Sequence, residues 1–288
     1  MTHLSRDAVL RASEDWKWVP PGAETLTIEG VTVIDYPEWA RMGFHAMPCD
    51  VAEPLTAVAA VQQAARERGR KTVDWWLSPA SRPSMEQTLI ANGAHLSVAL
   101  DILALDLSNG LPEIPESVGV ESHVVDDAKR LEDAERVAAT VWGGEPSSGE
   151  RRAAQLKSLA RVPDDDGGFR VVSYRDGRAI TTAGCQLADG VARLYAGCTI
   201  PDARGLGGYR ASVAKRLDVA WHNGARFALV HARVETSGPI LTRMGFQPYG
   251  EARVYDLAAA EPDPGSTAVE VDSGRFDNGA VSLTEVPR

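Results

Sequence analysis

The sequence ARGLGGYR, at Ala203–Arg210, concentrates residue types that can bind a phosphate. It holds three glycines and two arginines between an apolar run and a helical pattern. The first N–H groups of a helix lack partners within it and carry partial positive charge, and glycine lets the backbone approach a phosphate closely. The spacing matches neither a Walker A motif nor a dinucleotide-binding fingerprint. The stretch therefore predicts a phosphate-binding turn of another kind, with a plain tight turn as the alternative.

Alternating strands and helices surround this stretch and must position it. Apolar alternation predicts three strands within 167–200, joined at two turns that contain Asp176-Gly177 and Asp189-Gly190. An amphipathic helix follows from Tyr209, and Gly224 closes it. Further elements are expected at 118–125 (strand), 126–141 and 148–161 (helices), 225–234 (strand), 237–244 (short helix) and 245–257 (a final hairpin).

The N-terminal part of the chain carries a similar pattern. Helices are expected at 6–18, 52–66 and 82–94, and strands or hairpins at 25–37, 71–79 and 97–107. Both halves contain a Ser-x-Pro turn between a strand and a helix, which favours an internal duplication over two unrelated units. The expected division is a first domain at 1–110, a linker at 111–117, a second domain at 118–257 and a tail at 258–288, either a hairpin or disordered.

Composition and charge restrict the class of function. The chain has 288 residues and a formal net charge of −10, which disfavours a nucleic-acid binder and leaves room for a cationic small-molecule ligand. Its three cysteines have no CxxC spacing, which fits a reducing compartment. The polar start and the absence of a long apolar run predict a cytoplasmic protein without a membrane partner. A monomer or a homodimer is expected.

Two segments carry a resemblance to a known family. IPDARGLGGYRASV and ETSGPILTRMGF, with the helix and strand between them, resemble the second half of GNAT-family N-acetyltransferases over residues 117–257. WWLSPASRP and LDILALDL resemble the accompanying half of tandem members. The resemblance implies an α/β (α+β) fold, with a mixed, mostly antiparallel sheet flanked by helices and preceded by a smaller degenerate domain of the same type. It also implies acetyl-CoA or another acyl-CoA as co-substrate, and no metal.

The resemblance assigns the glycine stretch to the pyrophosphate of coenzyme A. Arg204 and Gly207 match the family loop, whereas Tyr209 stands where Gly or Ala is usual, and its ring is expected to point into the core. Pantetheine is expected along the strand that ends at Ile200, splayed from the strand at 226–234. The implied cofactor-binding residues are Cys198, Thr199, Ile200, Arg204, Gly205, Leu206, Gly207, Gly208, Tyr209, Arg210, Thr236 and Ser237.

The sequence departs from the family at the usual proton donor. The tyrosine that many members carry before Gly-Phe falls at Leu241, and the usual upstream asparagine falls at Val234. The strand at 192–200 offers no carboxylate to deprotonate an amine. A thiolate whose conjugate acid has a pKa of about 8.5 is a tolerable leaving group, so these losses need not abolish the chemistry.

Three catalytic candidates remain: His231, Tyr249 and Glu235. His231 lies in the middle of a strand and could act as a general base or be a hydrogen-bonded structural histidine. Tyr249, like Tyr195 and Tyr255, could act as an acid. Each assignment competes with a purely structural reading.

The ends of the expected cleft carry further polar residues. Glu235 and Thr236 could orient the substrate, while Thr236 or Ser237 could equally cap the next helix. Cys198 could accept an acyl group or be a small buried hydrophobe. The acidic run at 164–166 could attract a cationic amine or be a solvated loop.

The first half has no counterpart of the glycine stretch. Its corresponding segment is FHAMPCDVAEPL, in which Asp50 puts a negative charge where a pyrophosphate would lie. This half is expected not to bind coenzyme A and to shape the acceptor pocket. The expected function is acyl-CoA-dependent N-acylation of a small-molecule amine by direct attack on the thioester. The alternatives are a non-catalytic acyl-CoA-binding sensor, or a member with altered chemistry such as thioester hydrolysis or decarboxylation.

Overall fold

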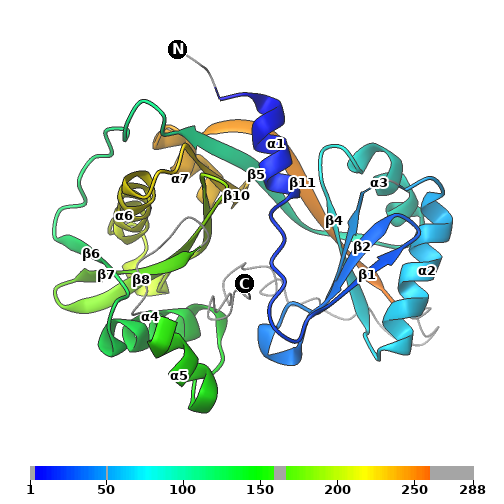
Figure 1. The fold of residues 1–288 in the computed structure, drawn as a ribbon, viewed down its shortest axis with the longest axis horizontal. Helices are drawn as coiled ribbons and strands as arrows, with labels where there is room; N and C mark the ends of the chain where they lie inside the picture. Colours follow the sequence, from blue (N-terminus) through cyan, green and yellow to red (C-terminus); the bar gives the residue numbers. More distant parts are fainter. Residues whose placement is uncertain (1–3, 50, 159–166, 260–288) are drawn as a thin grey trace. The chain divides into compact units, whose positions relative to one another are not determined.

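The computed structural model describes residues 4–49, 51–158 and 167–259, and they form two compact units (Figure 1). Unit 1 comprises residues 4–16 and 102–249, and unit 2 comprises residues 17–101 and 250–259. Each unit is therefore built from separate stretches of the chain, whereas the sequence suggests one boundary at 111–117. The acidic run at 164–166, Asp50 and the tail after Ala259 lie outside the described residues.

Unit 1 is built on a mixed sheet. Its strand order is β5-β10-β9-β8-β7-β6, in which β6 to β9 pair antiparallel and β9 pairs parallel with β10. Both expected Asp-Gly turns are present: Asp176 and Gly177 have positive φ, as do Asp189 and Gly190, as a type I′ hairpin requires. The strands are β5 (His95–Asp106, shared with unit 2), β6 (Val120–Val124), β7 (Gly168–Arg175), β8 (Arg178–Ala188), β9 (Val191–Thr199) and β10 (Phe227–Arg233).

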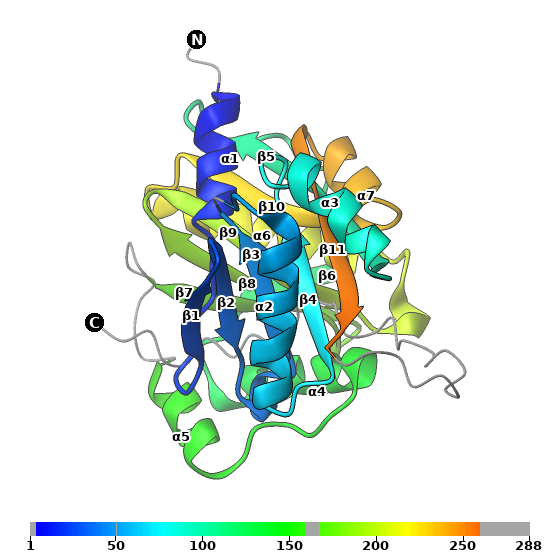
Figure 2. The same ribbon diagram turned by 90° about the vertical axis from the view of Figure 1, so that its right-hand side faces the viewer.

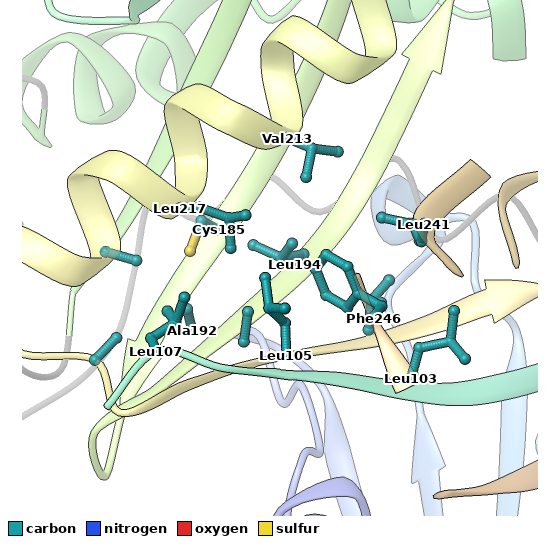
Figure 3. Packing of buried hydrophobic residues seen from close by; sticks show 14 of the residues in the cluster. Leu103, Leu105, Leu107, Cys185, Ala192, Leu194, Val213, Leu217, Leu241 and Phe246 are labelled. Carbon is teal, nitrogen blue, oxygen red and sulfur yellow. The ribbon is translucent and has the colours of Figure 1, made fainter. Parts of the chain in front are cut away.

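Helices cover both faces of this sheet. Val171 packs in a cluster with residues of α6, and its neighbour Val172 packs with residues of α4, because successive strand residues point to opposite faces. Figure 3 shows Val213 and Leu217 of α6 above Leu194 and Cys185 of the sheet. The helices of unit 1 are α1 (Arg6–Glu14), α4 (Ala128–Trp142), α5 (Gly149–Ser158), α6 (Gly208–His222) and α7 (Ser237–Arg243).

Unit 2 is a smaller sheet packed against α2 and α3. Its strand order is β1-β2-β3-β4-β11, and Figure 2 shows α2 lying along the strands. Its elements are β1 (Glu24–Ile28), β2 (Val31–Asp35), the 3-10 helix η1 (Glu38–Ala40), β3 (Phe44–Pro48), α2 (Pro54–Glu67), β4 (Thr72–Leu77), α3 (Arg82–Ala91) and β11 (Gln247–Ala258).

The expected final hairpin at 245–257 is wrong, because β11 is one uninterrupted strand. It pairs antiparallel with β4 from Arg253 opposite Leu77 to Ala258 opposite Thr72. This pairing buries Leu257 in the core of unit 2. A chain that turned back at Gly250 would lose both the ladder and this burial, so tertiary packing overrides the local turn signal.

Candidate acyl-CoA site

The glycine stretch lies where β9 leads into α6. β9 ends at Thr199, a 3-10 turn η2 (Pro201–Ala203) follows, and α6 begins at Gly208. Gly207 is the N-cap residue with φ 89°, and no side-chain cap hydrogen bond forms there among the described residues. The first N–H groups of α6 therefore lack the side-chain partner that usually satisfies one of them.

The glycines of this turn differ in how much room surrounds them. A Cβ on Gly207 would lie 2.9 Å from Ser117 Oγ, and one on Gly208 would lie 2.3 Å from Thr181 Oγ1. These two glycines let the turn pack closely on its neighbours. Gly205 differs, because it has φ 81° and no atom lies within 4 Å of its would-be Cβ. The turn therefore packs tightly at Gly207 and Gly208, whereas the position of Gly205 has room for a side chain or a ligand.

Three arginines surround the N-terminus of α6. Arg204 Nε donates to the carbonyl of Thr199 (3.4 Å), and Arg210 Nε donates to Ser117 Oγ (3.1 Å). Arg175 Nη1 donates to the carbonyl of Leu206 (3.4 Å), although it lies far away in the sequence. Sequence reasoning missed Arg175 and Ser117, and the only signal for Arg175 was its place beside a hairpin turn. The cluster concentrates positive charge at the positive end of a helix.

The expected splay beside β9 is confirmed. Parallel pairing covers three residue pairs, from Phe227 opposite Val191 to Leu229 opposite Arg193. Beyond Arg193 the two strands do not pair further, so this edge of β9 carries backbone groups that no strand of the described residues satisfies. An extended ligand can use such an edge as a sheet partner.

A β-bulge that the sequence did not reveal bends the same part of β9. The register against β8 shifts between Thr182 and Gly184, and Ala196 has φ 53°. A non-glycine residue with positive φ is uncommon, and bulges re-aim backbone groups beside functional sites. Gly197 follows the bulge and is exposed.

Tyr209 points into the interior, as expected. Its Cε2 atom would lie 2.6 Å from a Cβ on Gly197, and its ring packs against the core cluster of unit 1. Burial raises the pKa of Tyr209, while the nearby Arg216 guanidinium acts in the opposite direction. The bulky ring therefore fits only because residue 197 is glycine.

The end of β9 is held against β8. Thr199 Oγ1 lies 2.9 Å from Thr181 Oγ1, and the N–H of Ile200 donates to the carbonyl of Ile180 (3.0 Å). Cys198 is buried in a small apolar cluster with Val137. The backbone beside the glycine turn is therefore rigidly supported.

His231 contacts the N-terminal segment of the chain. Its Nε2 atom lies 2.7 Å from Ser13 Oγ, and its ring stacks on Trp16 with a centroid separation of 5.0 Å. Burial, with a smaller effect of Arg193, lowers the pKa of His231 to about 4. A neutral histidine with so low a pKa is a weak general base at neutral pH.

The remaining candidates lie at the ends of β10 and along β11. Glu235 and Thr236 are exposed, and Ser237 Oγ accepts from the N–H of Arg233 (2.9 Å). Thr236 precedes α7 without a side-chain cap hydrogen bond among the described residues. Tyr249 is partly buried, and burial raises its pKa, with a smaller contribution from Asp106.

Leu241 stands where the sequence resemblance would place a tyrosine. It is fully buried in the core cluster of unit 1, near Phe246 (Figure 3). No group of three or more potential metal ligands occurs in the described part of the chain, and no described helix is long and apolar enough to cross a membrane.

The chain is similar to known proteins in its structure and not in its sequence. No protein-family model matches the chain, and no curated protein matches it significantly. A GCN5-related N-acetyltransferase from Kribbella flavida is 21% identical with a TM-score of 0.66, covering 90% of this chain and 96% of its own. A GCN5-related N-acetyltransferase from Sphaerobacter thermophilus is 16% identical with a TM-score of 0.62, covering 90% and 87%.

A tandem protein shows the same likeness. The tandem GNAT protein from the clavulanic acid biosynthesis pathway is 17% identical, with a TM-score of 0.52, and the match covers 88% of this chain and 89% of that one. These matches span both units. The chain therefore has the fold of the GCN5-related N-acetyltransferases.

Proposed function

We propose that unit 1 transfers an acyl group from coenzyme A to the amine of a small molecule. The observation that carries this proposal is the α6 N-terminus, which has no side-chain cap, is open at Gly205 and is surrounded by three arginines. A pyrophosphate fits such a site through helix N–H groups and charge-assisted hydrogen bonds.

The course of the rest of the coenzyme follows from the strands. The unpaired edge of β9 begins beside the α6 turn and runs back toward Arg193. Pantetheine amides would pair with this edge as an added strand. The thioester would then lie near the bulge at Ala196 and Gly197, where backbone N–H groups can polarise its carbonyl.

The chemistry is a direct acyl transfer. The unprotonated amine nitrogen forms a bond to the thioester carbon, the carbon–sulfur bond breaks, and coenzyme A leaves as a thiolate that takes up a proton. The amine proton passes to solvent or to a base. His231 is a poor base because burial lowers its pKa to about 4, and Tyr249 and Glu235 remain candidates for proton transfer.

The phosphate assignment is tested at Gly205, where a side chain has room. Asp and Asn both tolerate positive φ, so Gly205→Asp and Gly205→Asn differ in charge alone. We expect Gly205→Asp to weaken coenzyme A binding by about tenfold or more, and the Asn variant to weaken it far less. Isothermal titration calorimetry at two salt concentrations measures both, and salt should reduce the difference. Equal affinities of the two variants would show that no phosphate binds beside residue 205.

A non-catalytic acyl-CoA-binding protein is the second candidate, and the buried Leu241 favours it. The two differ in turnover. Acetyl-CoA incubated with a panel of amines, with detection of free thiol, should release coenzyme A if the protein is an acyltransferase. Binding without thiol release for any amine would favour the binding protein. Malonyl-CoA incubated without an acceptor, followed by mass spectrometry, reports hydrolysis or decarboxylation.

A further inference from the structure

Arg193 is a buried arginine whose N–H groups are not all paired within the described residues. Its residue is 7% exposed, and its Nε atom has no hydrogen-bond partner. No ion pair or side-chain hydrogen bond of Arg193 occurs within residues 4–49, 51–158 and 167–259. Burial lowers the pKa of Arg193, and the charges of Asp189 and Asp15 oppose that shift without forming an ion pair.

Such an arrangement is unfavourable unless something else completes it. Removing an N–H group of a guanidinium from water without giving it an acceptor destabilises the fold. Buried polar groups in proteins are otherwise nearly always hydrogen-bonded. The missing partner is therefore an acceptor, and a negatively charged one compensates the guanidinium best.

The side chain projects from the sheet face opposite α6. Its neighbours Ala192 and Leu194 belong to the cluster beneath α6 (Figure 3), so Arg193 points the other way. His231 lies on that same face, because Val230 and Ala232 belong to the α6 cluster, and its pKa responds to Arg193.

The place of Arg193 along β9 relates it to the proposed reaction. Leu229 opposite Arg193 is the last recorded pair before β9 and β10 separate, so the guanidinium lies at the closed end of the splay. Tyr195 lies two residues further along β9, and its ring covers Gly184. Thr199, at the phosphate end, is six residues from Arg193, about 20 Å along an extended strand. The anion that binds Arg193 is therefore not the pyrophosphate.

We propose that Arg193 binds a carboxylate of the substrate, which its planar guanidinium can hold through two parallel hydrogen bonds. The proposal rests on the proposed function and deepens it. The carboxylate belongs either to the acceptor, which is then an amino acid rather than a simple cationic amine, or to the acyl group, which is then dicarboxylic.

Matched ligand pairs test the proposal on the full-length protein. In the donor arm, succinyl-CoA is compared with butyryl-CoA, which has a methyl group in place of the carboxylate. In the acceptor arm, amino acids are compared with their amides, with and without saturating coenzyme A. Thermal-shift titration gives the apparent affinity of each ligand, and we expect a preference of about tenfold for the carboxylate member in one arm.

The variant Arg193→Met keeps an unbranched, flexible apolar stem and removes the guanidinium with its charge. We expect it to lose the carboxylate preference while binding coenzyme A as the wild type does. We also expect it to melt a few degrees higher without ligand, because an unpaired buried charge is gone. If Arg193 served only to stabilise the fold, its replacement would lower the melting temperature.

The outcomes separate the two proposals. A preference in the donor arm or in the acceptor arm that Arg193→Met abolishes supports the carboxylate site and identifies its source. No preference in the wild type, an unchanged preference in the variant, or a lower melting temperature of the variant overturns it. Failure of the wild type to bind coenzyme A overturns the proposed function instead, and the titrations of amino acids and amides alone then decide the carboxylate site.

Discussion

At the scale of single residues, His231 shows how burial determines what a side chain can do. Histidine has an ordinary pKa of about 6.5, and burial lowers the pKa of His231 to about 4. Its Nε2 atom lies 2.7 Å from Ser13 Oγ, and its ring stacks on Trp16. The residue that looked most like a general base in the sequence therefore joins the N-terminal segment to β10.

This pKa shift makes stability depend on pH. The folded-state pKa lies below the unfolded-state value, so between pH 6.5 and 4 the unfolded state takes up a proton that the folded state does not. The contribution is fully present above pH 6.5 and is lost as pH falls toward 4. We expect roughly 2 kcal/mol less stability at pH 4.5 than at pH 7 from this residue alone.

Urea unfolding of His231→Gln at both pH values measures the effect. The variant should lose less stability on acidification than the wild type. His222→Gln, at an exposed histidine of α6, is the control and should follow the wild type. If His231→Gln follows it too, the histidine is not held neutral.

At the scale of elements, the bulge in β9 depends on two glycines that leave room for two tyrosines. A Cβ on Gly184 would lie 2.3 Å from the Tyr195 ring, and one on Gly197 would lie 2.6 Å from the Tyr209 ring. Two aromatic rings, each packed against a glycine, therefore shape the strand beside the proposed thioester site.

We expect Gly184→Ala to destabilise the protein by about 1–3 kcal/mol, because the ring or the bulge must shift. Tyr195→Ala makes room for the added methyl group, so the double variant should lose less stability than the sum of the two single variants. A double-mutant cycle by chemical denaturation measures this coupling. Strict additivity would contradict the close contact.

At the scale of the whole molecule, the last strand of the chain belongs to the core of unit 2. β11 pairs with β4, and Leu257 is 3% exposed within the core of unit 2. The neighbouring Ala258 is exposed. A substitution near the end of the described chain should therefore damage a unit built mostly from residues 17–101.

We expect Leu257→Asp to remove hydrogen-exchange protection from β2, β3 and β4, since it places an unpaired charge in that core. β7, β8 and β9 of unit 1 should lose much less. Ala258→Asp is the matched control and should leave both patterns as in the wild type. Protection lost first from β7 to β9 would contradict the building of unit 2 from separate stretches of the chain.

The sequence by itself determined the local features. The Asp-Gly hairpins, the glycine turn before α6 and the order of strands and helices follow from positive-φ requirements and apolar periodicity, which act over a few residues. Tertiary structure alone decided how distant segments meet: β11 with β4, α1 with β10, and Arg175 and Ser117 beside the α6 turn. It also decided that Nε of Arg193 is buried without a hydrogen-bond partner among the described residues. Such contacts join residues far apart in the chain, and only the burial gained by the complete fold selects among them.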